Sequence, residues 1–247
     1  EDQVELDKWI INETKTLQKE IISLYESYSY HKAIQKIHNF CVNELGGIYL
    51  DIVKDRLYTC KNESLARRSC QTSLDFILNV LVRLIAPILS YTAEEIWQTS
   101  NRLNSQGDSV FLSNFDTSQI NYESNINQSE WKRIFEIKDA VNQSIEAMRN
   151  ENKIKGSLDS IVDIQTTSND LNILKKLGEE LHFLFISSEA NVNEAKSFKI
   201  KVNSSKNTKC VRCWHRCSSV GSSKEHPELC NRCIENVEKN GEQRSFL

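Results

Sequence analysis

The sequence predicts a mainly α-helical protein: an antiparallel helical bundle, then a small α/β subdomain, then a C-terminal module with two pairs of cysteines. Three observations predict this order. Apolar residues recur at three- and four-residue steps from residue 5 to residue 152, the period of helices that bury one face. The chain then changes to short apolar runs, and five of its eight cysteines fall near the end. The predicted segments are 1–155, 156–205 and 206–247, and we call the last one the cysteine module.

The clearest helix is predicted from about residue 64 to residue 86, where one apolar stripe includes Leu74, Ile77, Leu78, Leu81 and Ile85. Pro87 ends or kinks this helix because proline lacks an amide hydrogen. The next helix is predicted to begin at a capping box formed by Thr92 and Glu95. Residues 100–128 are polar and predict a long surface loop. A stripe that begins at Trp131 predicts the last long helix.

The small α/β subdomain is predicted from a change of period after residue 157. Residues 161–164, 183–186 and 198–202 are β-like runs, whereas residues 170–181 have a helical pattern. Short apolar runs of this composition are typical of strands. A polar stretch, 203–207, then links the subdomain to the cysteine module.

Composition limits the class of protein. The chain has 247 residues, of which 39% are hydrophobic, so it is able to bury a core. No run approaches the roughly 18 apolar residues that a membrane span needs, and the acidic start is unlike a signal peptide. We therefore expect a cytoplasmic protein that does not contact membranes. The sequence begins without Met, and we expect it to be a piece of a longer chain.

Charge is distributed unevenly along the sequence. The net charge is −3, which argues against coating nucleic acid by bulk electrostatics. Residues 199–247, however, hold ten Lys or Arg against five Glu. This basic end is a candidate contact for a polyanion, and binding there should weaken with salt.

The cysteine spacing is the strongest chemical signal. Cys210 and Cys213 are separated by two residues, Cys230 and Cys233 likewise, and sixteen residues lie between the pairs. Two such turns place four thiolates around one ion, and this set favours Zn²⁺. Because four cysteines leave no open coordination position, the predicted role of the single zinc ion is structural. The module has few large apolar residues, so we expect chelation to unfold it and to spare the helices.

Other residues near the pairs have two interpretations. Arg212 and Trp214 flank Cys213 and present a guanidinium and an indole that suit an unstacked RNA base. Alternatively, Trp214 fills the small core of the module, and the basic residues beside the cysteines neutralise the thiolates: Lys209, Arg212, Arg216 and Arg232. Three possible rival ligands, Cys217, His215 and His226, are interpreted as bystanders. The scattered Cys41, Cys60 and Cys70 are interpreted as small buried apolar side chains.

The helical region contains no motif of an active site: HExxH, a P-loop and a glycine-rich nucleotide turn are all absent from the sequence. A basic set surrounds one helix junction: Lys54, Arg56, Lys61, Arg67 and Arg68. Each member is either part of a solvated face or a phosphate contact.

Two stretches of the sequence resemble a known family. Ala66-Arg67-Arg68-Ser69 followed by LDFILNVLVRLIAPILSYTAEEIW resembles the anticodon-binding helical bundle of class I synthetases for isoleucine, valine, leucine and methionine. Cys210-Val211-Arg212-Cys213-Trp214-His215, with the second cysteine pair and the closing Gly241-Glu242-Gln243-Arg244, resembles the C-terminal zinc module of bacterial isoleucyl-tRNA synthetases. The two stretches together cover most of the chain.

The resemblance implies a function for the longer protein. The family activates isoleucine with ATP, transfers it to tRNA(Ile) and edits valine on another domain. Its HIGH and KMSKS motifs are absent here, so the chain is expected to bind the anticodon stem-loop, to catalyse nothing and to leave ATP to the missing catalytic domain. The expected partners are tRNA(Ile) and the catalytic and editing domains, in a monomeric protein. By position, the four paired cysteines would bind zinc, and Arg212 and Trp214 would face RNA, with Arg67 and Arg68 as further contacts.

Two other classes compete with this interpretation. DNA glycosylases of the formamidopyrimidine type end in a finger with the same cysteine spacing, but they require an N-terminal catalytic proline and a helix-two-turn-helix, which this sequence lacks. A third interpretation makes the cysteine module a platform for docking another protein.

Overall fold

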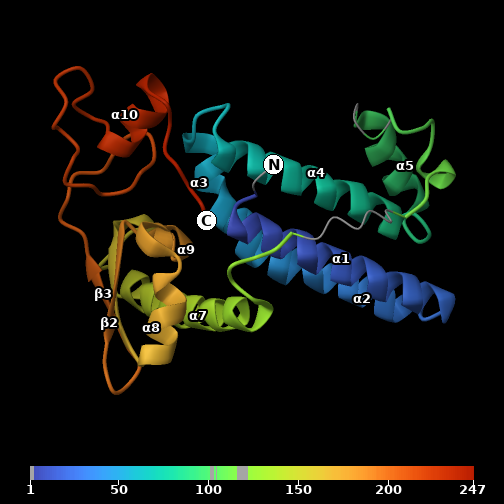
Figure 1. The fold of residues 1–247 in the computed structure, drawn as a ribbon, viewed down its shortest axis with the longest axis horizontal. Coiled ribbons are helices and arrows are strands. Elements are labelled where there is room, and N and C mark those ends of the chain that lie inside the picture. The colour runs from blue at the N-terminus through green and yellow to red at the C-terminus, as the bar shows by residue number, and fades with distance from the viewer. Residues whose placement is uncertain (1–2, 101–102, 104, 116–121) are drawn as a thin grey trace. The chain divides into compact units, whose positions relative to one another are not determined.

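The computed structural model describes residues 3–100, 103, 105–115 and 122–247. Helices dominate these ranges, and a small sheet and a cysteine-rich end follow them, as the sequence predicts (Figure 1). The helices of the first half are α1 (Glu5–Glu26), α2 (Tyr30–Phe40), a π-helix (Cys41–Leu50), α3 (Asp51–Thr59), α4 (Leu65–Ile85) and α5 (Ser90–Thr99). The second half contains α7 (Gln128–Asn150), β1 (Ser160–Thr166), α8 (Ser168–Lys175), α9 (Leu181–Leu184), β2 (Glu189–Glu194), β3 (Lys199–Ser204) and α10 (Asn231–Glu238).

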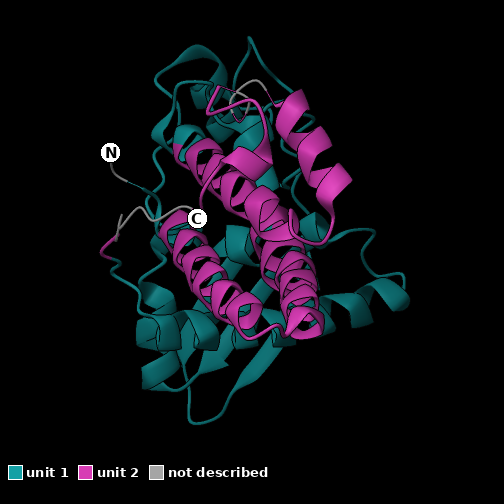
Figure 2. Cartoon of the chain, turned by 90° about the vertical axis from the view of Figure 1, so that its right-hand side faces the viewer, with its two compact units in different colours: residues 1–6, 52–68, 124–247 teal, residues 7–51, 69–123 magenta. Residues whose placement is uncertain are grey.

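The chain forms two compact units, which Figure 2 shows in different colours. The first unit comprises residues 1–6, 52–68 and 124–247, and the second comprises residues 7–51 and 69–123. Each unit is therefore assembled from segments that are distant in sequence.

The second unit is a helical bundle that is held by apolar packing and a few buried polar contacts. The Tyr49 hydroxyl, which is fully buried, donates to Asp7 Oδ1 at 2.7 Å, and Ser69 Oγ donates to the other carboxylate oxygen. At the corner between α4 and α5, Trp97 is fully buried and its indole nitrogen donates to the Gly107 carbonyl at 2.8 Å. Buried polar groups are costly unless they are paired, so these contacts fix how the helices meet.

The π-helix was not expected from the apolar period. It contains Gly46, where an added Cβ would lie 2.9 Å from the Cys41 carbonyl oxygen. A side chain at this position would thus push the backbone apart. The two adjacent glycines, Gly46 and Gly47, permit the wider turn at this point.

Two predictions for the middle of the chain need correction. Helix α5 begins at Ser90 and its N-cap, Leu89, makes no side-chain cap, so Thr92 lies inside the helix and the predicted capping box there is wrong. A capping box does form at the start of α7, between Asn127 and Glu130. The predicted surface loop, 100–128, lies partly outside the described residues, and its described part buries Leu103, Val110 and Ile126. The mostly polar composition of this stretch gave no sign that these three apolar side chains are buried.

The first unit contains a three-stranded sheet in the order β2-β1-β3, in which β1 runs parallel to β2 and antiparallel to β3. Val162 and Ile164 of the central strand are fully buried. Their partners on β3 are Val202 and Ile200, and this face of the sheet packs against α7 and α8. The alternation of side chains along a strand leaves the opposite face open.

The sequence predicted β1 and β3 correctly but misplaced the strand between them. Phe183 and Leu184 lie in α9, not in a strand, and the second strand is Glu189–Glu194. Apolar runs of four residues fit a buried helical turn as well as a buried strand. The true strand has the polar sequence EANVNE, which gives no apolar signal.

Cys60 and Cys70 are buried as predicted, whereas Cys41 is half-buried. In the described part of the chain, the structure contains no helix with the length and apolar character that a membrane crossing requires.

Candidate zinc centre and nucleic-acid interface

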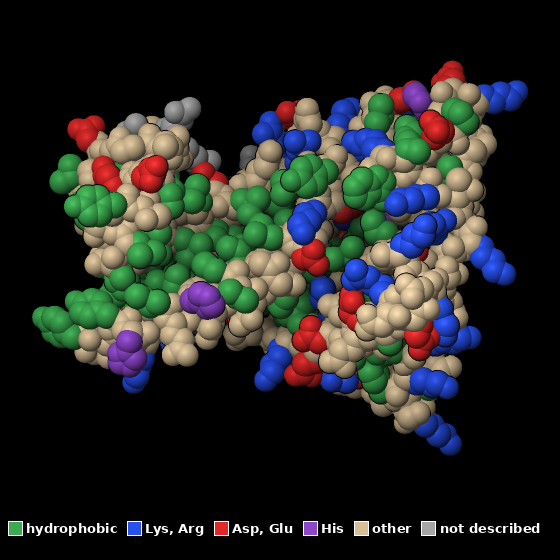
Figure 3. Space-filling model, turned by 180° about the vertical axis from the view of Figure 1, so that it is seen from behind, with side chains coloured by type: hydrophobic (Ala, Val, Ile, Leu, Met, Phe, Trp, Pro, Cys, Tyr) green, Lys and Arg blue, Asp and Glu red, His purple; other side chains and the backbone are tan. Residues whose placement is uncertain are grey.

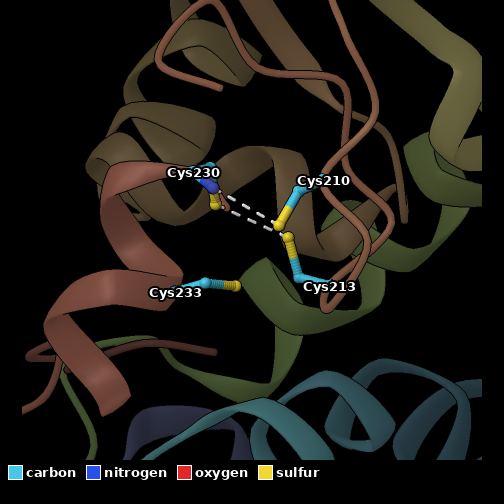
Figure 4. A group of neighbouring side chains, drawn as sticks. All are labelled: Cys210, Cys213, Cys230 and Cys233. Carbon is cyan, nitrogen blue, oxygen red and sulfur yellow. Dashed lines mark hydrogen bonds between the residues drawn. The ribbon is translucent and has the colours of Figure 1, made fainter. Parts of the chain in front are cut away.

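The four paired cysteines converge on one point. Cys210 and Cys213 come from a loop, and Cys230 and Cys233 come from the start of α10 (Figure 4). All four side chains are buried, and their sulfur atoms lie within 4.8 Å of one another. The Cys230 amide donates to Cys210 Sγ at 3.4 Å, which ties the two turns together. The N-terminal end of a helix also favours the negative charge of a thiolate.

The spacing of the sulfur atoms suits zinc. Two Zn–S bonds of about 2.3 Å at a tetrahedral angle hold their sulfurs about 3.8 Å apart. Cys213 Sγ and Cys230 Sγ are separated by 3.7 Å. Because the donor set is four soft thiolates in a closed cluster, it fits a structural zinc ion and offers no position for water or substrate.

The first cysteine turn presents an aromatic ring to solvent. The backbones of Lys209 and Arg216 form an isolated antiparallel β-bridge across the turn. The Trp214 amide donates to the Cys210 carbonyl at 3.0 Å. Trp214 has a φ of +68°, a left-handed conformation that costs a non-glycine residue energy. Its side chain is 59% exposed, and Lys209 Nζ lies 5.3 Å from the centre of the ring. Trp214 therefore does not fill the core of the module.

The rival ligands lie outside the cluster. Among the described residues, the group of side chains that is able to hold a metal consists of the four cysteines alone. His215 is buried, with Nδ1 3.2 Å from the Cys213 carbonyl oxygen. His226 pairs with Glu238. Cys217 is partly buried, packs against the cluster and interacts with Cys230.

A buried network of charges fastens the cysteine module to α3. Arg232, which lies between Cys230 and Cys233 in the sequence, donates to Asp55 at 2.6 Å from Nη1 and 2.9 Å from Nη2. Arg244 donates to the same carboxylate from a side chain that is only 1% exposed. Glu242 lies 3.2 Å from both arginines and accepts from the Cys60 thiol at 3.1 Å. The network thus joins residues of α3 to residues near the end of the chain.

The charges in this network are set by their neighbours. Burial alone would raise the pKa of Asp55, but Arg232 and Arg244 outweigh it and hold the pKa well below its usual range. The pKa of Glu242 is also lowered, because Arg244 and Arg232 outweigh burial there. Burial and the Glu242 carboxylate raise the pKa of the Cys60 thiol to about 12. Both carboxylates are therefore ionised, and the thiol remains a hydrogen-bond donor.

The other predicted RNA contacts have partners within the protein. Arg212 Nη1 donates to the Thr59 carbonyl at 2.7 Å and lies 3.8 Å from Cys233 Sγ. Arg67 Nη1 donates to Asn62 Oδ1 at 2.6 Å, and Arg68 pairs with Glu63 at the surface. Of the four predicted contacts, Trp214 is the side chain that the structure leaves most open, and Arg212 is in part a bridge to α3.

Sequence reasoning missed the network around Asp55. Arg232 was noted only as a possible neutraliser of the thiolates, and Asp55, Glu242 and Arg244 were not singled out as a group. Asp55 and Arg232 are 177 positions apart, so no local pattern connects them. The closing Gly-Glu-Gln-Arg was part of the family resemblance, and it is the one signal that pointed to this region.

The fold and the cysteine cluster define a class of protein. Residues 7–165 match the family model described as the anticodon-binding domain of tRNA ligase. Residues 208–236 match a second model, described as a zinc finger found in FPG and IleRS. The chain belongs to the anticodon-binding domain family of tRNA ligases.

Comparison with curated proteins shows which tRNA ligases the chain resembles. An isoleucine--tRNA ligase from Teredinibacter turnerae is 40% identical over 259 residues, which cover 100% of this chain and 28% of the relative. One from Marinomonas sp. is 42% identical over 260 residues (99% and 27%), and one from Ruthia magnifica subsp. Calyptogena magnifica is 44% identical over 255 residues (98% and 27%). The chain spans little more than a quarter of the length of these relatives. Together with the match to the anticodon-binding family, they favour tRNA binding over the DNA-binding alternative.

Proposed function

We propose that this chain is the part of an isoleucine–tRNA ligase that recognises the anticodon stem-loop of tRNA(Ile). Aminoacylation with ATP would take place on other domains of a cytoplasmic, monomeric enzyme, and this chain alone would not catalyse it. Support comes from relatives that bear this name and align with the whole chain. We further propose that segments 1–155, 156–205 and 206–247 act as the bundle, the connecting subdomain and the cysteine module.

One zinc ion, held by the four cysteines, would give the cysteine module its shape. The ion would act as a structural cross-link between two turns, because four thiolates close its coordination sphere. Side chains of the protein would position the module and its exposed tryptophan. Arg232 and Arg244 bind Asp55 and hold the module on α3, and the first cysteine turn holds Trp214 outward.

The observation that carries this proposal is the exposed Trp214 ring on a turn that two ligand cysteines hold in place. An unstacked base of an anticodon loop would stack on the indole, with Lys209 beside it to attract phosphate. Arg212, Arg67 and Arg68 are proposed as further contacts.

Fluorescence anisotropy with labelled tRNA(Ile) tests the proposal. Trp214→Ala should weaken binding by about 1–3 kcal/mol, which is the usual contribution of one base stacked on an aromatic ring. Val211→Ala is the matched control, because Val211 is 55% exposed on the same turn and has no ring to stack. Equal losses in the two variants would exclude stacking on Trp214.

A second comparison tests which tRNA is recognised. The wild-type chain should bind tRNA(Ile) more tightly than tRNA(Val) at the same salt concentration, since affinities for RNA depend strongly on salt. Equal affinities would contradict recognition of tRNA(Ile) and would leave the zinc centre unaffected.

A further inference from the structure

Five exposed lysines follow one another in the sequence from the loop before β3 to the first cysteine turn. They are Lys196, Lys199, Lys201, Lys206 and Lys209, and we call them the lysine row. Within the described ranges, none of the five forms an ion pair. Figure 3 shows Lys and Arg side chains projecting from this part of the chain, on the right of that view. Five exposed lysines that form no ion pair within the protein attract polyanions.

The strand itself sets the direction of two of these lysines. Lys199 and Lys201 alternate along β3 with Ile200 and Val202, which pair with the buried residues of β1 and lie on the side of α7. The lysines therefore lie on the open face of the sheet. At about 6.7 Å for two residues of a strand, their spacing is close to that of successive phosphates in an extended nucleic-acid strand.

The open face of the sheet also carries two carboxylates, which reduce the positive charge beside β3. Asp163 of β1 is the cross-strand partner of Lys201 and accepts hydrogen bonds from Asn191 at 3.1 Å and Asn203 at 3.0 Å. Glu189 of β2 accepts a hydrogen bond from Asn191 at 3.1 Å. The five lysines outnumber these two carboxylates. Gln165 and Asn193 are exposed beside Asp163. Amide groups such as these are able to bond with ribose hydroxyls and phosphates.

The row is continuous with the turn that carries Trp214. Beyond β3, Lys206 and Lys209 lie at the start of the cysteine module, where the Cys217 amide donates to the Thr208 carbonyl at 3.1 Å. Arg216 then binds Asp159, immediately before β1, at 2.6 Å. The sheet, the lysine row and Trp214 are thus parts of one bonded assembly within the first unit.

We propose that the lysine row binds the sugar–phosphate backbone of the RNA whose base stacks on Trp214, so that the RNA runs from the cysteine module along β3. This inference rests on the proposed function and adds the path of the RNA to it. Lysines also protect edge strands from pairing with other chains, and β3 is such an edge. That role would account for Lys199 and Lys201, but Lys206 and Lys209 lie beyond the end of the strand.

Salt dependence of tRNA(Ile) binding tests the inference. The two test variants are Lys199→Gln with Lys201→Gln, and Lys206→Gln with Lys209→Gln. Each should make the slope of log affinity against log salt less negative by about 2, because each lost phosphate contact contributes about 1. Between 50 and 200 mM salt, the wild type should then lose about 16-fold more affinity than either variant. Restoring charge with Lys199→Arg and Lys201→Arg should restore the slope.

The matched control is Lys19→Gln with Lys32→Gln, which removes the same charge from exposed positions on α1 and α2. Slopes of both test variants equal to that of the control would overturn the lysine row while leaving tRNA binding intact. Absence of binding by the wild type would instead overturn the proposed function, and this inference with it. Light scattering shows whether the Lys199→Gln and Lys201→Gln variant self-associates through the exposed edge of β3. If it does, the salt slope of the Lys206→Gln and Lys209→Gln variant alone decides whether the lysine row binds RNA.

Discussion

Replacing Asp55 should loosen the cysteine module more than any surface change of the same charge. The Asp55 carboxylate accepts hydrogen bonds from both Arg232 and Arg244, and its side chain is 16% exposed. Asn at this position keeps the shape but removes the charge, so Glu242 alone would face two buried guanidinium groups. Removing one partner of a buried ion pair typically costs about 3–5 kcal/mol, because an uncompensated charge remains. We expect Asp55→Asn to reduce the free energy of unfolding of the module by this amount.

Urea unfolding of the zinc-loaded chain measures this loss, with release of zinc to a chromogenic chelator as the signal. Glu63→Gln is the control, because it removes the same charge from a pair in which Arg68 is 55% exposed and Glu63 is 73% exposed. Exposed pairs contribute at most about 1 kcal/mol. The reasoning is refuted if Asp55→Asn is no more damaging than Glu63→Gln.

Two further predictions concern metal removal and pH. Chelation of zinc should expose the amides of residues 206–247 to rapid hydrogen exchange and leave those of α1 and α4 protected, because the module lacks an apolar core of its own. Unchanged protection of residues 206–247 would contradict this prediction. The control variant Cys217→Ser should exchange as the wild type does, before and after chelation. Burial, with the neighbouring His215, lowers the pKa of His182 to about 4. As the pH falls, the imidazole of His182 takes up a proton in the unfolded chain before it does so in the folded chain. The free energy of unfolding should therefore be unaffected by this group above about pH 6.5 and should fall by up to about 1.4 kcal/mol per pH unit below it. Urea midpoints at about pH 7 and about pH 5.5 should therefore differ less in His182→Gln than in the wild type, provided that zinc content is equal. An unchanged difference would argue against a neutral imidazole at this half-buried position.

The parts of the fold that sequence predicted are those with a local signal. The stripe from Leu74 to Ile85 marks α4, and the spacing of the cysteine pairs marks the cluster, because each pattern lies within a short stretch of chain. The capping prediction at Thr92 was wrong because the helix continues upstream to Ser90 without a side-chain cap. A motif of four residues does not reveal which turn of a helix it occupies.

The parts that sequence did not predict depend on distant contacts. Phe183 read as a strand residue, yet it lies in α9 with the Arg244 guanidinium 3.4 Å from the centre of its ring. Arg244 also binds Asp55, which is 189 positions away. Packing against distant residues favours a helix at Phe183, and the β-propensity of the local sequence is too weak to outweigh this packing. The direction of Arg212 toward Thr59 likewise depends on where α3 lies.

X-ray absorption at the zinc edge of the purified chain is the most direct test, because the whole site depends on the four cysteines binding one ion. We predict one zinc atom per chain with four sulfur neighbours at about 2.3 Å. An ordered cysteine module without metal, or a module whose cysteines are joined in disulfides, would contradict the account.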